Sequence, residues 1–169
     1  MIQRPSFIAL FLLAAAAAGC DSQEAQLEFE NDANKPPDGI VVTDENGTIV
    51  TDDPDDWRTS PSFAGTVRFE PAYANPTAAG DLITVPVIVQ QFNALPGGLE
   101  LRGFDDTGKL TLLDDLPQAT QPGAYTFVFS PSQFSPAGNL AAVRGLHRVF
   151  VFGIRGSSQV ISYGDILVQ

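Results

Sequence analysis

The side chains that could do chemistry in this 169-residue chain are few. It has one cysteine, Cys20, and one histidine, His147, which lies between Leu146 and Arg148. A serine or cysteine nucleophile needs a nearby base, and a zinc site needs several His or Cys ligands. A single histidine, far in sequence from the single cysteine, predicts neither arrangement. We therefore expect His147 to have a structural or surface role.

Carboxylates are the other reactive groups. Ca²⁺ prefers clustered carboxylate oxygens, and four aspartates gather in one short stretch: Asp52, Asp53, Asp55 and Asp56. The stretch lacks the sixth-position glycine and the closing glutamate of an EF-hand loop, so a solvated acidic spacer is favoured over a weak calcium site. The pairs Asp105-Asp106 and Asp114-Asp115 are expected in turns or on opposite strand faces, unlike the facing carboxyls of a glycosidase. We predict no enzymatic activity and no cofactor.

The first twenty residues have the composition of an export signal. One basic residue, Arg4, precedes an apolar run from Phe7 to Ala18, and small residues lead up to Cys20. The run is shorter than the roughly 20 residues that a membrane-spanning helix needs, so we predict a secretory signal that is removed. An ordinary cut after Ala18 would leave Cys20 with a free thiol.

The end of this signal is similar to the lipobox of bacterial lipoproteins. Its residues read Ala17, Ala18, Gly19 and Cys20, with Ala17 where leucine is most common. The resemblance implies that residues 1–19 are cleaved off and that Cys20 becomes the N-terminus, carrying fatty acyl chains such as palmitate. Two or three chains, at about 0.8 kcal/mol per buried CH₂, would anchor the protein durably. The protein is then expected in the cell envelope, exported across the cytoplasmic membrane, with inner and outer membrane both open.

Residues 20–56 are expected to form an acidic flexible tether. Residues 21–56 contain twelve acidic residues and one lysine, a net charge of −11, whereas residues 57–169 carry a net charge of −1. High charge and few aromatics predict disorder, with a reach on the order of 30–35 Å. Within the tether, Asn46-Gly47 between two β-branched runs predicts a hairpin over residues 40–51. The chain has no basic patch, so we do not expect it to bind nucleic acid.

From Trp57 to Gln169, short runs with alternating apolar residues recur between turn residues. They predict strands at 65–70, 82–89, 99–104, 109–113, 124–129, 147–152 and 160–168. Seven short strands predict an all-β domain, a single immunoglobulin-like β-sandwich over residues 57–169. The 147–152 strand is apolar on both faces and is expected to be central. Pro86 lacks a backbone N–H, so we expect the 82–89 strand at a sheet edge or with a bulge.

Several turn motifs follow one another in a family-like order. They are Pro71-Ala-Tyr-Ala-Asn-Pro76, the hairpin from Leu99 to Leu110, Pro122-Gly-Ala-Tyr-Thr-Phe127 and the strand start at Gly145. Their order resembles the immunoglobulin-like modules at the C-termini of type IX-secreted proteins and in flagellar hook-capping proteins. The resemblance covers about residues 71–169 and departs at Ala74, where the family has proline. It implies the fold and a cell-envelope setting, but not a sorting function, because no large cargo accompanies the module.

Together these features predict a membrane-anchored envelope lipoprotein with a non-catalytic sandwich that contacts an envelope protein or glycan, or is structural. The alternative is an adaptor subunit in export or surface assembly, and a small hydrolase is less favoured. An exposed edge at 82–89 that captures a peptide would favour the adaptor. A groove lined with aromatics would favour glycan binding, and a cleft with two convergent acids would favour the hydrolase.

Overall fold

The computed structural model describes residues 22–154 and 159–169, so the predicted signal and Cys20 lie outside the described residues. A helix of residues 22–33 comes first, and in the described part no helix is long and apolar enough to cross a membrane. A two-stranded ribbon and two short 3₁₀ helices accompany the sandwich: β1 (Val42–Thr43), β2 (Ile49–Thr51), η1 (Pro61–Phe63) and η2 (Pro131–Phe134). The sandwich strands are β3 (Val67–Phe69), β4 (Ile83–Val89), β5 (Leu99–Phe104), β6 (Leu110–Leu116), β7 (Gly123–Phe129), β8 (Gly145–Gly153) and β9 (Ser162–Val168). Each falls where the sequence predicts a strand.

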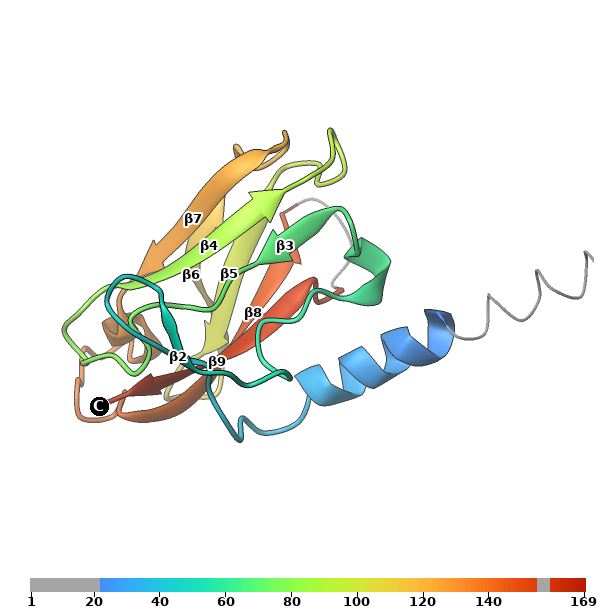
Figure 1. Cartoon of the computed structure of the whole chain (residues 1–169). Helices are drawn as coiled ribbons and strands as arrows, with labels where there is room; N and C mark the ends of the chain where they lie inside the picture. The colour runs from blue at the N-terminus through green and yellow to red at the C-terminus, as the bar shows by residue number, and fades with distance from the viewer. Residues whose placement is uncertain (1–21, 155–158) are drawn as a thin grey trace, which may run out of the picture.

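The sandwich strands form two antiparallel sheets that face each other (Figure 1). The three-stranded sheet has the order β3-β4-β7, and the four-stranded sheet has the order β6-β5-β8-β9. This is the strand order of an immunoglobulin-like fold in which the fourth strand has joined the second sheet. The predicted all-β sandwich is confirmed, and β8 is central as expected, between β5 and β9.

The core follows from period-2 alternation along the strands. In β4 the four alternate apolar residues from Ile83 to Val89 are buried, and the residues between them are partly exposed. Leu99 and Leu101 of β5 and Val149 and Val151 of β8 face them from the other sheet within one buried cluster. Alternation therefore fixes which face of each sheet points inward.

The expectation for Pro86 is wrong. β4 is the central strand of its sheet, in unbroken register with β7 from Ile83 to Val89. The irregularity lies in the neighbouring strand instead, because β3 ends at Phe69, opposite Val87. Pro86 still accepts a bond from the Glu70 N–H at 3.1 Å, and its missing donor faces the irregular chain beyond that contact. A central strand accommodates a proline where the neighbouring chain leaves regular pairing, which resumes at the bridge between Tyr73 and Thr84.

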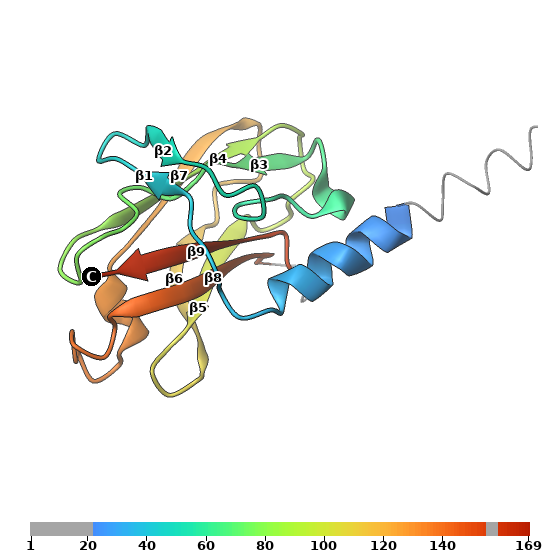
Figure 2. The same cartoon turned by 60° about the horizontal axis from the view of Figure 1, so that its bottom comes forward.

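The expectation of a flexible tether is also wrong for the described residues 22–56. The N-terminal helix (residues 22–33) lies beside β8 and β9, where Figures 1 and 2 both place it, and it buries Phe29 and Ala33 against Tyr163 and Phe150. Val41 and Trp57 enter the main core. Average composition predicts disorder for this segment, but its few apolar side chains are spaced to reach the sandwich.

The predicted hairpin is confirmed as the ribbon of β1 and β2. The Asp44 side chain accepts bonds from the N–H groups of Asn46 and Thr48, and Gly47 adopts a positive φ of 81°. Since a lone hairpin is marginal in water, its attachment matters. The Thr43 N–H donates to the Asn75 carbonyl at 2.8 Å, and the Thr43 hydroxyl donates to the Ala72 carbonyl.

Candidate functional site

The predicted site residues do not lie together in the structure. The signal residues Ala17, Ala18 and Gly19 and the lipid-attachment residue Cys20 lie outside the described residues. Asp52 is exposed in the segment after β2. The other three calcium candidates line a small cavity of about 60 Å³ at the C-terminal end of the helix: Asp53, Asp55 and Asp56, with Asp32, Lys35, Asp38, Arg148, Tyr163 and Asp165.

Asp56 holds two segments together at this cavity. One carboxylate oxygen accepts the Val41 N–H at 3.1 Å, and the other accepts the Asp165 N–H at 2.7 Å. Burial raises the pKa of Asp56 to about 7, and the nearby charges of Asp165 and Asp53 act in the same direction. Both oxygens of this carboxyl are therefore used by the backbone.

Arg148 connects β8 to the end of the N-terminal helix. Its guanidinium forms a bidentate pair with Asp165 at 2.7 Å and 2.7 Å, and it lies over the Tyr163 ring at 4.7 Å. A further N–H group donates to the carbonyls of Asp32 and Lys35 at 2.8 Å and 2.7 Å. Carbonyls at a helix C-terminus have no partner within the helix, so a cation that binds them stabilises the helix end.

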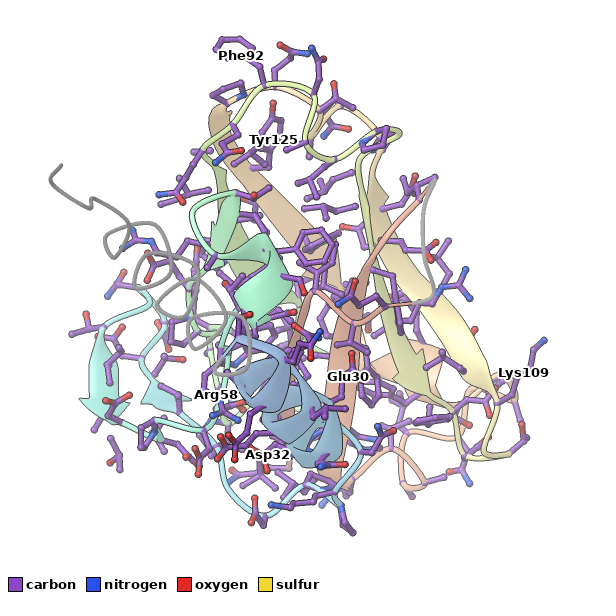
Figure 3. All side chains as sticks on the ribbon, turned by 90° about the vertical axis from the view of Figure 1, so that its right-hand side faces the viewer. Glu30, Asp32, Arg58, Phe92, Lys109 and Tyr125 are labelled. Carbon is purple, nitrogen blue, oxygen red and sulfur yellow. The ribbon has the colours of Figure 1, made fainter. Side chains whose placement is uncertain are left out.

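A second arginine, more exposed than Arg148, also binds a residue at the end of the helix. Arg58 donates to Asp32 at 2.7 Å and to the Tyr163 hydroxyl at 2.8 Å (Figure 3 labels Asp32 and Arg58). Hydrogen bonds from Lys35 and then Arg58 hold the pKa of Asp32 below its usual value. We call Asp32, Asp56, Arg58, Arg148, Tyr163 and Asp165 the helix junction.

The acids of the helix junction have the contacts of a structural network. Asp56 and Asp165 are close enough to interact electrostatically, but the oxygens of both are bound by the backbone or by Arg148. The cavity is about the size of a few water molecules, too small for a sugar ring. Within residues 22–154 and 159–169, no three acidic, His or Cys side chains are placed to hold a metal ion. The structure therefore does not assemble the four aspartates of the calcium alternative.

The remaining candidates, His147 and Asp105, contact neighbouring parts of the fold. The His147 ring stacks on Phe134 at 4.3 Å, and its Nε2 lies 2.8 Å from the Val143 carbonyl oxygen. Asp105 accepts the N–H groups of Thr107 and Lys109 in the β5–β6 turn. Both side chains therefore make contacts within the fold.

An open apolar groove lies on the outer face of the four-stranded sheet, beside the N-terminal helix. Its volume is about 550 Å³, within the usual range for small-molecule sites. Five apolar and three polar side chains line it: Phe104, Leu110, Phe150, Phe152 and Val160, with Glu30, Asn34 and Gln159. We call this set the aromatic groove.

The aromatic groove exists because the helix covers only part of an apolar sheet face. Phe104 and Phe152 point outward between inward-facing core residues, since neighbours on a strand alternate between faces. The helix buries the side near Tyr163 through Phe29, with ring centroids 5.3 Å apart. Phe104 remains 50% exposed and packs edge-on against Phe150 at 5.9 Å.

Sequence reasoning missed both the helix junction and the groove. The available signal was Phe150 and Phe152 alternating with Val149 and Val151, which makes both faces of β8 apolar. An apolar outer face requires a cover or a ligand. Phe29 was the one aromatic in the acidic segment before Trp57, and it supplies part of that cover.

The described fold is an immunoglobulin-like β-sandwich with an added N-terminal helix and ribbon. Comparison of the chain with protein-family models, with curated proteins and with solved structures finds no match. Its function is therefore inferred from its own residues.

Proposed function

We propose that this protein is a cell-envelope lipoprotein, anchored through acylated Cys20, whose sandwich binds a glycan non-catalytically in the aromatic groove. The anchoring part rests on the signal sequence that ends in Ala17-Ala18-Gly19-Cys20. The binding part rests on one observation, an open groove lined by phenylalanine rings together with amide and carboxylate side chains.

The chemistry of the aromatic groove suits a sugar. The C–H faces of a pyranose ring are apolar and stack on aromatic rings, while its hydroxyls need donors and acceptors at the edge. Phe104 and Phe152 supply ring surface, and Asn34, Gln159 and Glu30 supply the polar groups. Ligand sites commonly combine an apolar lining with a few orienting polar groups.

The two other functions have less support. A free edge at residues 82–89 would have favoured the adaptor hypothesis, but β4 is paired on both sides. The hydrolase hypothesis relied on two convergent acids free to act, but Asp56 and Asp165 are bound by backbone groups and Arg148. A binding module fits these residues better than a catalyst does.

The anchoring is tested by intact-mass analysis and membrane fractionation of the full-length protein beside Cys20→Ala. We expect acyl mass on the wild type, which stays with the membrane, and a variant that becomes soluble. Protease treatment of intact cells then shows whether the sandwich faces outward. A mature protein that begins at Gly19 with an unmodified thiol would contradict the anchoring.

The binding is tested by affinity electrophoresis in gels that contain envelope polysaccharides. We expect at least one polysaccharide to retard the wild type and Phe92→Ala but not Phe104→Ala. Phe92 is a matched control because it is 73% exposed and lies at the top of Figure 3, away from the helix. Equal retardation of both variants would place binding elsewhere, and no retardation of the wild type would turn the search to protein ligands.

A further inference from the structure

We infer that the N-terminal helix is a rigid post that holds one end of the sandwich close to the lipid surface, in place of a long tether. This inference rests on the proposed acylation of Cys20. It concerns the contact between the sandwich and a bilayer, which the anchoring alone leaves undefined.

The first step is that the helix is fixed to the sandwich along its length. Near its start, the Gln26 side-chain oxygen accepts bonds from the Ser60 hydroxyl at 2.8 Å and the Ser62 hydroxyl at 2.9 Å. In its middle, Phe29 is buried to 3% exposure. At its end, Arg148 binds the carbonyls of Asp32 and Lys35. Three separate contacts leave the helix no freedom to swing.

The second step is the length of chain between the anchor and the first of these contacts. Only Asp21 separates Cys20 from Ser22, and two residue steps span at most about 7 Å even when fully extended. The helix from Ser22 to Gln26 rises about 6 Å. The expected flexible tether would have reached on the order of 30–35 Å. The sandwich must therefore stay near the membrane surface.

The third step is that the helix is unsuited to lying flat in the bilayer interface. An interfacial helix presents a broad apolar face, with basic residues on the polar face. Here Phe29 and Ala33 are buried against the sandwich, and the only large apolar side chain exposed on the described helix is Leu27. Its exposed positions also carry Glu24 and Glu28, which anionic lipids repel.

These steps define which surface meets the lipid. The start of the helix projects beyond the sheets on the side of η1, and the β3–β4 connection lies at the opposite end (Figure 1). The end that carries η1 therefore faces the membrane. The aromatic groove, which Glu30 and Asn34 of the helix border, opens beside the post within reach of ligands at the membrane surface.

The rigidity of the link is tested first without lipid. Two spin labels are placed on mature chain carrying Cys20→Ser, one at Gln23→Cys on the helix and one at Ala64→Cys beside η1, both exposed positions. We expect pulsed electron paramagnetic resonance to give a narrow distance distribution. A broad distribution would mean a detached helix and would overturn the inference.

The position at the membrane is tested on acylated protein in vesicles that contain acceptor-labelled lipids. The acylated Cys20 leaves an introduced cysteine as the only free thiol, so donors are attached at Ala64→Cys or, at the far end, Asp81→Cys. We expect several-fold stronger energy transfer from the η1 side. An insertion of about twelve Gly and Ser residues after Asp21, which adds roughly 20 Å of reach, should remove this difference.

The outcomes separate this inference from the proposed function. Equal energy transfer from the two labelled positions of acylated protein, unchanged by the insertion, would overturn the inference of a rigid post while the anchoring stands. A chain without acyl mass in the intact-mass experiment would overturn the anchoring, and with it the membrane contact. The distance distribution would then still report whether the helix is docked.

Discussion

At the scale of single residues, Asp56 shows how a carboxyl that suggested calcium binding can serve the fold instead. It bridges the N–H groups of Val41 and Asp165, which are far apart in the sequence. Burial raises its pKa to about 7. The folded state therefore retains a proton that the unfolded chain, with an ordinary aspartate pKa, has released at pH 5 or 6.

This proton makes stability depend on pH in a direction opposite to that of a salt-bridged acid. Between pH 4 and 7 the native state binds more protons than the unfolded state, so the free energy of unfolding should fall as pH rises, by at most about 1.4 kcal/mol per pH unit. Urea unfolding at intervals from pH 4 to 8 measures this slope. Asp56→Asn should be less stable throughout but show a flatter profile, while Asp52→Asn, at an exposed site, should keep the wild-type slope. If the stability of Asp56→Asn depended on pH as strongly as that of the wild type, the pH dependence would belong to another group.

The two arginines of the helix junction should differ in importance because they differ in burial. The side chains of Arg148 and Asp165 are 8% and 5% exposed, whereas Arg58 is 34% exposed. Removing one partner of a buried pair strands the other charge, so Arg148→Met should lower the free energy of unfolding by about 3–5 kcal/mol. Arg58→Met should lower it by about 1 kcal/mol or less. Chemical denaturation of the two variants side by side checks the ranking, and equal losses would contradict it.

At the scale of elements, the N-terminal helix depends on its partner more than on its own sequence. Helices of about twelve residues are marginal in water, and this one gains its stability from docking. Its contacts are Phe29 and Ala33, four residues apart on one face, and the carbonyls held by Arg148. In the sequence, two apolar residues spaced by four within an acidic segment are too few to show a helical period, so they do not predict the helix.

Truncation of the docked aromatic should release the helix. Phe29→Ala should destabilise the docked state by on the order of 3 kcal/mol, because it removes a buried ring and leaves a cavity. Hydrogen exchange by mass spectrometry should then show loss of protection over residues 22–33, with the sandwich strands little changed. Leu27→Ala is the matched control, since Leu27 is on the same helix but 61% exposed. Retained protection in Phe29→Ala would mean that Gln26 and Arg148 suffice to hold the helix.

At the scale of the whole molecule, strands and non-local contacts differ in how far sequence predicts them. The alternation from Ile83 to Val89 and the turn at Asp105 depend on neighbours in the chain, and both were predicted. The pairing of β4 depends on the order of strands in its sheet. The packing of Phe29 over Tyr163 joins residues more than a hundred positions apart. Local patterns do not contain that information, so the position of Pro86, the docked helix and the aromatic groove emerged only from the structure.

The contacts of the first segment with the last strand also set an order of events. Phe29 packs on Tyr163, the Trp57 N–H donates to the Tyr163 carbonyl, and the Asn75 side chain binds the backbone of Asp165 and Leu167. During synthesis the N-terminal helix emerges well before its partners in β9 have been made. Contacts so distant in sequence form slowly, because the loop must close before they are gained. The chain cannot lock into its native form before β9 has been made, so a chain exported as we propose would still be unfolded enough for translocation when its N-terminus reaches the membrane.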